Sequence, residues 1–182
     1  HVLNNILKTL DPAIIKVDKI DEVENAFVIR YENDAVIIHD GKIIDQNILS
    51  SGTKAGITIA SMVTAMQDCA YGFYYCDEKF SYIHSDIEKA ILSVMISSIK
   101  NNEQLFFTTH NTNVLDMPLP KHSFTFLKKD VLDDEEPIKC ISASSMLKRN
   151  TDSLKNAVEN DLFSVAPNID LIYSLADDEE GI

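Results

Sequence analysis

Two short apolar runs, each ending abruptly in polar residues, limit the fold of this chain more than any other feature. Residues 73–76 are followed by the acidic pair Asp77 and Glu78, and residues 104–109 are followed by His110. Short apolar runs that stop in this way are typical of buried parallel strands. In α/β folds, functional groups lie beyond the carboxyl ends of such strands. A functional site is therefore predicted at the ends of these two strands.

One helix is predicted between the two runs and another just before the first run. The helix between the runs begins near Ser85, which has the spacing of a capping box with Glu88, and the earlier helix covers residues 52–70. Both segments carry apolar residues at spacings of three and four, as helices with one buried face do. The expected inward positions are Ile59, Met62, Val63, Met66, Ile87, Ile91, Val94 and Met95. This order predicts an α/β fold with a mostly parallel sheet flanked by helices.

A β-rich N-terminal arm is expected before this unit, over residues 1–48. An apolar helical stripe in residues 2–10 opens the arm. His39, Asp40 and Gly41 then separate two β-rich runs and predict a hairpin, because Asp-Gly accepts the positive φ of a tight turn.

Signals near the end of the chain are weaker. They predict strands at residues 123–128 and 138–142 and a short helix at 153–158. The expected organisation is therefore the arm, a lobe over residues 49–175, and an acidic tail over 176–182.

Charge and cysteine content argue against several classes of protein. The chain has 29 acidic and 16 basic residues among 182, a net charge of −13. Such an acidic surface repels phosphate backbones, so direct nucleic-acid binding is not expected. No apolar run approaches the roughly 18 residues needed to cross a bilayer, so no membrane partner is expected. Three cysteines without C-x-x-C spacing and the lack of a basic-then-apolar leader favour a cytoplasmic location.

A run of serine, glycine, threonine and lysine residues lies at the start of the predicted helix over residues 52–70. The run consists of Ser50, Ser51, Gly52, Thr53 and Lys54. Backbone N–H groups at the positive end of a helix dipole can bind a phosphate. The plainer alternative is a serine N-cap followed by a glycine turn.

The residues at the two strand ends could have separate chemical roles. Of two adjacent acids, Asp77 could hold Mg²⁺ through water, and Glu78 could orient or deprotonate an attacking water. His110 could donate a hydrogen bond to a terminal phosphate oxygen. The alternatives are a solvated Asp-Glu turn and a structural histidine.

Taken in order, these clusters resemble the C-terminal half of the ABC-type ATPase heads. More narrowly, they are similar to the AAA-type ATPases of the OLD/RecF/SMC-like group, which includes many bacterial phage-defence and abortive-infection proteins. The resemblance spans roughly residues 45–172 and is carried by residues 49–54, 76–84 and 104–116. It implies the C-terminal lobe of a P-loop NTPase fold, with ATP and Mg²⁺ as cofactors.

The resemblance also implies a role for each cluster in an ATP-dependent homodimer. Asp77 would hold Mg²⁺ through water, Glu78 would be the catalytic base, and His110 would be the switch histidine. Residues from Ser81 to His84 would form the D-loop across the dimer. The signature residues Ser50, Ser51, Gly52, Thr53 and Lys54 would contact ATP bound to the opposite subunit.

One part of such an ATPase is missing from the sequence. No G-x-x-x-x-G-K-[ST] motif occurs, and Gly41-Lys42 is followed by Ile43. Without this loop the β- and γ-phosphates have no cradle. We therefore expect a separate N-terminal Walker A half as a partner, and no ATP hydrolysis by this chain alone. A nuclease or another effector is a further expected partner.

Two other functions remain open. The first is a metal-dependent nuclease that uses Asp77, Glu78 and His110, together with a further acid such as Asp86 or Asp116. The second is a non-catalytic interaction domain derived from an ATPase.

Overall fold

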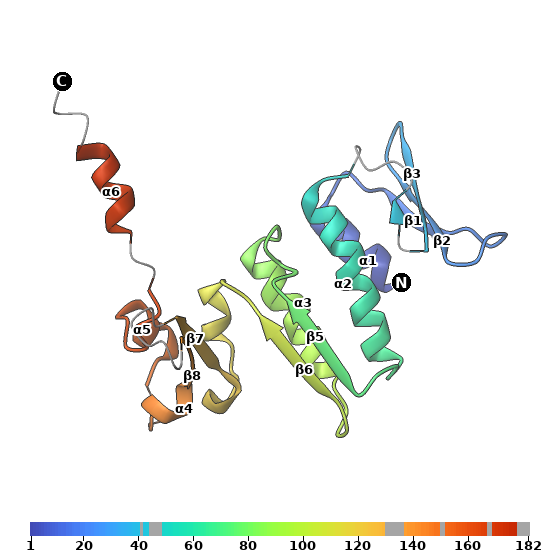
Figure 1. The fold of residues 1–182 in the computed structure, drawn as a ribbon. Helices are drawn as coiled ribbons and strands as arrows, with labels where there is room; N and C mark the ends of the chain where they lie inside the picture. Colours follow the sequence, from blue (N-terminus) through green and yellow to red (C-terminus); the bar gives the residue numbers. More distant parts are fainter. Residues whose placement is uncertain (41, 44–48, 130–136, 150–151, 167–168, 178–182) are drawn as a thin grey trace. The chain divides into compact units, whose positions relative to one another are not determined.

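The computed structural model describes residues 1–40, 42–43, 49–129, 137–149, 152–166 and 169–177. The chain divides into two compact units, His1–Val114 and Leu115–Ile182 (Figure 1). Each unit contains its own hydrophobic core. Among the helices in the described ranges, none has the length and apolar content required to cross a membrane.

The first unit begins with a helix and a small antiparallel sheet. Helix α1 (Val2–Leu10) is followed by β1 (Lys16–Lys19), β2 (Ala26–Arg30), β3 (Ala35–His39) and β4 (Lys42–Ile43). The strands pair in chain order, and every pairing is antiparallel. The predicted hairpin is confirmed, since His39 pairs with Lys42 and Asp40 has a φ of 50°. Gly41 lies outside the described residues.

The N-terminal arm packs on the first long helix of the same unit. Helix α2 (Ser51–Gln67) contacts α1 at Gly56, where an added Cβ would meet methyl groups of Leu7 and Leu10. The core between arm and helix consists of Leu7, Ile14, Ile29, Val36, Ile38, Leu49 and Ile57. The structure thus divides the chain between Val114 and Leu115, and the expected arm and the start of the expected lobe share a core.

A strand–helix–strand unit forms the rest of the first unit, as predicted. Strand β5 (Phe73–Asp77) leads through α3 (Ser85–Ser98) to β6 (Gln104–Thr108), and the two strands pair in parallel. Side chains on one face of the pair pack with α2 and α3. The buried members of this core are Ile59, Val63, Met66, Tyr74, Cys76, Phe80, Ile91 and Met95. The predicted core face of α2 is confirmed, with Met62 partly buried against it.

The parallel sheet is smaller than predicted. The described residues form one parallel pair and two antiparallel sheets, so the fold is a mixed α/β arrangement rather than a mostly parallel sheet. The β-rich arm accounts for one antiparallel sheet, and β7–β8 accounts for the other.

Two predictions for α3 were wrong. The helix is capped by His84, whose Nδ1 accepts the Asp86 N–H at 3.2 Å, so Ser85 and Glu88 do not form a capping box. Val94 is 46% exposed, because the buried stripe runs through Glu88, Ile91, Leu92 and Met95 and leaves Val94 at its margin. The other three predicted inward residues, Ile87, Ile91 and Met95, do pack in the core.

The second unit is built around an antiparallel pair and short helices. The 3-10 turn η1 (Thr112–Asp116) leads into it, and η2 (Lys121–Ser123) precedes β7 (Thr125–Lys129) and β8 (Ile138–Ser142). Helices α4 (Ala143–Met146), α5 (Leu154–Glu159) and α6 (Asp170–Asp177) follow. The predicted strands and the short helix are confirmed. Residues 130–136 and the acidic tail beyond Asp177 lie outside the described residues.

Candidate functional site

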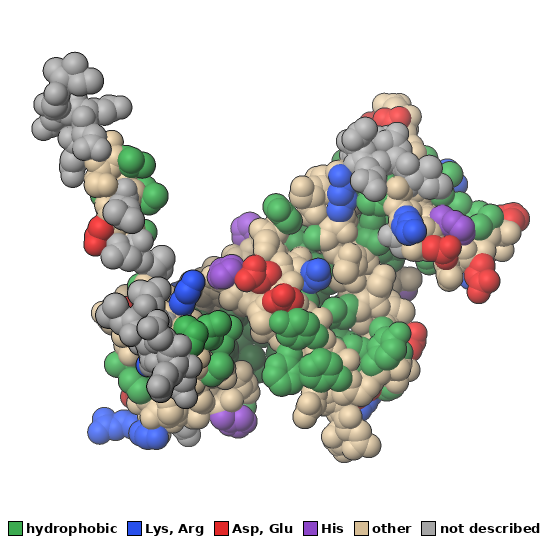
Figure 2. Space-filling model, viewed as in Figure 1, with side chains coloured by type: hydrophobic (Ala, Val, Ile, Leu, Met, Phe, Trp, Pro, Cys, Tyr) green, Lys and Arg blue, Asp and Glu red, His purple; other side chains and the backbone are tan. Residues whose placement is uncertain are grey.

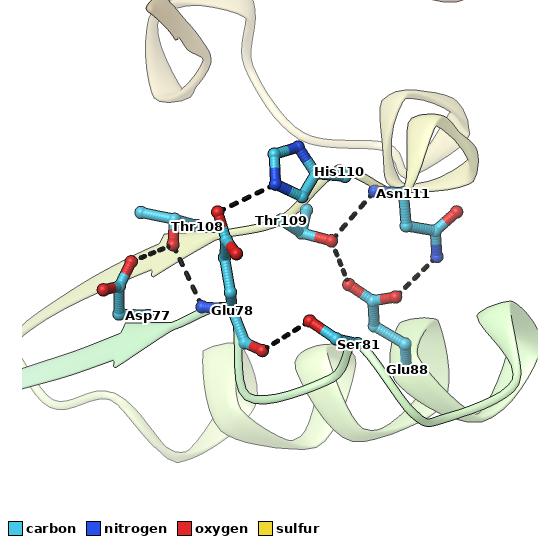
Figure 3. Close-up of polar contacts among 8 residues, drawn as sticks. All are labelled: Asp77, Glu78, Ser81, Glu88, Thr108, Thr109, His110 and Asn111. Carbon is cyan, nitrogen blue, oxygen red and sulfur yellow. Dashed lines mark hydrogen bonds and ion pairs between the residues drawn. The ribbon is translucent and has the colours of Figure 1, made fainter.

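The carboxyl ends of β5 and β6 bring the predicted acids and histidine together (Figure 3). Asp77 is the register partner of Thr108. The Thr108 hydroxyl donates to Asp77 Oδ1 at 2.6 Å, and the Glu78 N–H donates to the same hydroxyl at 3.1 Å. The Glu78 N–H also lies 3.2 Å from the Thr108 carbonyl oxygen. Thr108 therefore joins the two strand ends, a role that the sequence did not reveal.

The side chains of Glu78 and His110 make an exposed polar contact across the strand ends. Glu78 Oε1 lies 2.8 Å from His110 Nε2, and the two side chains are 50% and 84% exposed. Exposed pairs of this kind contribute only about 0–1 kcal/mol to stability. The pair therefore does more to orient the two side chains than to stabilise the fold.

The backbone at Glu78 adopts a conformation that side chains disfavour. Its φ is 47°, in the left-handed region. After this turn the Ser81 hydroxyl donates to the Glu78 carbonyl at 2.8 Å, and the buried Phe80 packs against Phe107 with ring centroids 5.2 Å apart. These contacts hold the Glu78 side chain at the carboxyl end of β5, although its left-handed backbone conformation is energetically unfavourable.

Residues 50–54 form the amino end of α2. Ser50 is the N-cap, and its Oγ accepts the Thr53 N–H at 3.0 Å. The Thr53 side chain is fully buried, and its hydroxyl lies 2.8 Å from the Ser50 hydroxyl, so Thr53 supports the cap instead of facing solvent. The Lys54 N–H donates a hydrogen bond to the Ser50 carbonyl oxygen at 3.0 Å. Because a helix leaves its first N–H groups without intrahelical acceptors, those of Ser51 and Gly52 can bind an anion.

The start of α2 also contacts the loop that follows the acidic pair. A Cβ added at Gly52 would lie 3.0 Å from the Tyr82 carbonyl oxygen. Only a residue without a side chain allows this approach, so glycine at position 52 has a packing reason. Tyr82 and His84 on this loop have exposed side chains. The start of α2 thus lies close to the loop that follows Glu78, although no described hydrogen bond or ion pair joins residues 50–54 to Asp77, Glu78 or His110.

A hollow of about 320 Å³ lies between the strand ends and the start of α3. It is lined by Glu78, Phe80, Ser81, Ile83, Ser85, Glu88, Thr109, His110 and Asn111. One wall therefore comes from the loop after β5 and the start of α3, and the other from the residues after β6. The lining combines polar and charged side chains with the apolar Phe80 and Ile83.

Glu88 is the main residue of this region that sequence reasoning missed. Its side chain is 2% exposed and accepts hydrogen bonds from Thr109 Oγ1 at 2.6 Å and from Asn111 Nδ2 at 2.7 Å. An acid three residues before Ile91, on the inward face of a helix, was the signal that could have revealed it.

At the strand ends, Asp77 offers one carboxylate oxygen that makes no described hydrogen bond. Asp77 is exposed, and its Oδ1 is engaged by Thr108 while Oδ2 makes no described hydrogen bond. Carboxylate oxygens that retain water suit Mg²⁺, which keeps several waters when bound. Within the described ranges, no group of three or more His, Cys, Asp or Glu side chains could hold a metal ion by itself.

Cys76, next to the acidic pair, belongs to the core and not to the site. It is fully buried in β5, and burial raises the pKa of its thiol to about 11. A thiol with such a pKa stays protonated at neutral pH and is a poor nucleophile.

Comparisons of the chain with protein-family models, with curated proteins and with solved structures gave no match. The geometry around the ends of β5 and β6 is therefore the basis for assigning a function.

Proposed function

We propose that this chain is the signature- and Walker B-bearing lobe of an ABC-type ATPase head of the OLD/RecF/SMC-like group. The proposal is supported above all by one observation: Asp77, Glu78 and His110 meet at the ends of two parallel strands. The contact between Gly52 and the loop after Glu78 adds the start of α2 to the same region. Because phage-defence proteins belong to this group, protection of a bacterial cell against phage is the cellular role to test.

The strand-end residues would act on the phosphates of ATP. Asp77 would hold Mg²⁺ through water, and the bound cation would offset the negative charge of the β- and γ-phosphates. Glu78 would orient and deprotonate the attacking water, using the carboxylate that His110 now fixes at 2.8 Å. His110 is 84% exposed, so its imidazole can turn toward a γ-phosphate oxygen and donate a hydrogen bond to it.

The amino end of α2 would contact ATP held by the opposite subunit. The Ser51 and Gly52 N–H groups and the helix dipole favour a phosphate at this position. Ser50 and Thr53 keep the helix start in place, and Lys54 adds a positive charge. Tyr82 is 73% exposed, which leaves the loop between Ser81 and His84 accessible to the second copy of an ATP-dependent homodimer.

A separate segment would supply the phosphate loop. The sequence contains no such loop, so this chain alone is not expected to hydrolyse ATP. The outer face of β5–β6 supports the existence of a further layer, because Phe73, Tyr75 and Phe106 are each more than half exposed there (Figure 2). Parallel sheets are almost always covered on both faces. A Walker A segment packed on this face would both cover the aromatic side chains and complete the ATP site.

The nuclease alternative is less well supported by the geometry. It needs a further acid or lysine beside Asp77, Glu78 and His110. Of the two acids considered, Asp86 lies 3.8 Å from His84 Nδ1, and Asp116 is paired with Lys155 at 2.9 Å. A non-catalytic interaction domain would have no need for the Glu78–His110 pair.

The test follows nucleotide-dependent association in the polypeptide or complex that contains both this chain and the phosphate loop. The Glu78→Gln variant is expected to bind ATP and accumulate as a nucleotide-bound dimer, because turnover would stall. Mass measured by light scattering with and without Mg-ATP gives the result, and Glu24→Gln, at an exposed acid between β1 and β2, is the control.

Two outcomes would contradict the proposal. One is a mass that does not respond to Mg-ATP in any variant. The other is Mg²⁺-dependent DNA cleavage that persists without ATP and is lost in Glu78→Gln, which would establish the nuclease alternative. Calorimetry on this chain alone should detect no micromolar affinity for ATP.

A further inference from the structure

A buried carboxylate, Glu88, lies at the wall of the hollow, on the inward face of α3. We infer that Glu88 is a positioning residue that fixes His110 at the end of β6, an inference that rests on the proposed ATPase function. Among the described residues, Glu88 and Thr53 are the only buried polar or charged residues. Thr53 is explained by the cap of α2, whereas no helix cap or ion pair explains Glu88.

An acid at this position is costly for the core. Removing a carboxylate from water is strongly unfavourable unless hydrogen bonds compensate. The ion pairs of the described residues do not include Glu88. Its compensation comes from neutral donors, Thr109 Oγ1 at 2.6 Å and Asn111 Nδ2 at 2.7 Å. A leucine would suit the buried stripe better, so what the acid offers is its two directed acceptors.

The two donors are the residues on either side of His110. Each oxygen of the carboxylate binds one of them, and the Asn111 N–H donates in turn to Thr109 Oγ1 at 3.0 Å. Glu88, Thr109 and Asn111 therefore form a closed ring of hydrogen bonds (Figure 3). This ring holds the backbone before and after His110 against α3.

His110 itself has few other restraints. Its side chain is 84% exposed, and its described polar contact is the one to Glu78. The position of its imidazole therefore follows from the backbone that Glu88 fixes. Glu88 also lies in the first turn of α3, directly after the loop from Ser81 to His84. It thus connects the two walls of the hollow between Glu78 and His110.

In the proposed reaction, loss of this ring should slow the chemical step rather than weaken nucleotide binding. Loss of the ring would let His110 move away from Glu78 and from a γ-phosphate, while the groups proposed to bind the rest of the nucleotide would stay in place. Misplacement of a catalytic group by about 1 Å can cost roughly 10²-fold in rate. The effect should therefore fall on kcat and leave KM nearly unchanged.

The experiment compares Glu88→Ala with Glu88→Gln. Glutamine can keep the ring, because its Oε1 can accept from Asn111 Nδ2 and its Nε2 can donate to the Thr109 hydroxyl. Alanine removes both bonds. In the polypeptide or complex that contains the phosphate loop, Glu88→Ala should lower kcat roughly 10–100-fold, and Glu88→Gln should restore most of it. Glu24→Ala, at an exposed acid of the same unit, is the matched control.

A second measurement keeps this inference separate from the ATPase proposal. The NMR signals of the His110 ring and the Asn111 amide can be followed in this chain without nucleotide. Glu88→Ala should shift both signals and move the His110 ring signals toward those of Glu78→Ala, whereas Glu88→Gln should resemble the parent. If Glu88→Ala does not fold, Thr109→Val removes two of the three bonds of the ring, those of its hydroxyl with Glu88 and with the Asn111 N–H, and should shift the same signals.

Each outcome decides the inference. His110 signals that are unchanged in Glu88→Ala, or in Thr109→Val where that variant takes its place, would overturn it. So would a Glu88→Gln variant as impaired as Glu88→Ala, because the ring would then not be what matters. If the NMR signals shift as predicted but the parent does not hydrolyse ATP, the positioning role of Glu88 is supported and the proposed ATPase function is refuted.

Discussion

At the scale of single residues, Glu78 combines a functional side chain with an unfavourable backbone. Its φ of 47° lies in a region that costs residues with a Cβ of order 1 kcal/mol or more. The surrounding contacts of Thr108 and Ser81 hold this conformation.

The backbone cost predicts a difference between two substitutions at this position. Glu78→Gly and Glu78→Ala both lose the contact with His110, but only alanine keeps the Cβ that disfavours φ 47°. We expect the free energy of unfolding to be about 1 kcal/mol higher for the glycine variant than for the alanine variant. Urea denaturation of the two variants measures this difference. Equal stabilities would show that the turn is not left-handed in solution.

The cysteines provide a prediction about burial around β5. Cys76 is buried, with its thiol pKa raised to about 11, whereas Cys69 and Cys140 are exposed. Because the thiolate is the reactive form, a raised pKa lowers its fraction at pH 8. Iodoacetamide should therefore modify Cys69 and Cys140 but spare Cys76 until the chain is denatured, as read by peptide mass spectrometry. Rapid labelling of Cys76 in the folded chain would contradict the burial of this side chain against α2 and α3.

At the scale of elements, the start of α2 serves both the fold and the proposed site. Ser50 caps the helix through the Thr53 N–H, and Gly52 allows the close approach of the Tyr82 carbonyl. The cap explains why this helix begins at Ser51. The same geometry leaves the N–H groups of Ser51 and Gly52 for an anion.

A pair of substitutions at Ser50 separates the two roles of this helix start. Ser50→Ala should lower the free energy of unfolding by about 1 kcal/mol, because the cap is lost. Ser50→Asp keeps a capping side chain, so stability should stay near that of the parent. The added negative charge should nevertheless weaken ATP-dependent dimerisation. Thermal unfolding and light scattering measure the two effects, and normal dimerisation of Ser50→Asp would argue against phosphate binding here.

Helical periodicity predicted α2 and α3, short apolar runs with abrupt polar ends predicted β5 and β6, and weaker signals located β7, β8 and α5. Periodicity did not predict the inward position of Glu88, because the partners of this carboxylate follow β6. Thr108 was missed for a similar reason: its hydroxyl gains its role only when the two parallel strands are aligned. The meeting of Asp77, Glu78 and His110 was predictable, because parallel strands end at one edge of a sheet.

At the scale of the whole molecule, the outer face of β5–β6 exposes aromatic side chains that a further segment could cover in the proposed head. Phe73 and Phe106 contact each other with ring centroids 5.4 Å apart, yet both remain 54% exposed. Among the described residues, this is the only parallel pair, and no third strand extends it. In the proposed head, the phosphate-loop segment packs on this face.

This arrangement predicts that one substitution has little effect on the chain alone and a large effect on the complete head. Phe106→Ser should change the stability of this chain by no more than about 1 kcal/mol, because the side chain is exposed. In the polypeptide that contains the phosphate loop it should sharply reduce ATP hydrolysis. Leu127→Ser, at a similarly exposed position in β7, is the control and should have neither effect. Full hydrolysis by Phe106→Ser would show that the aromatic face is not an interface.

The most direct test of the assignment is the rate of ATP hydrolysis by the complete head, with and without the Glu78 carboxylate. A positioned general base contributes roughly 10²–10⁴-fold to a rate. Glu78→Gln should therefore lower kcat by about that factor while Mg-ATP still binds, and Glu24→Gln should match the parent. A Glu78→Gln variant that hydrolyses ATP as fast as the parent would contradict the role of Glu78 as the catalytic base.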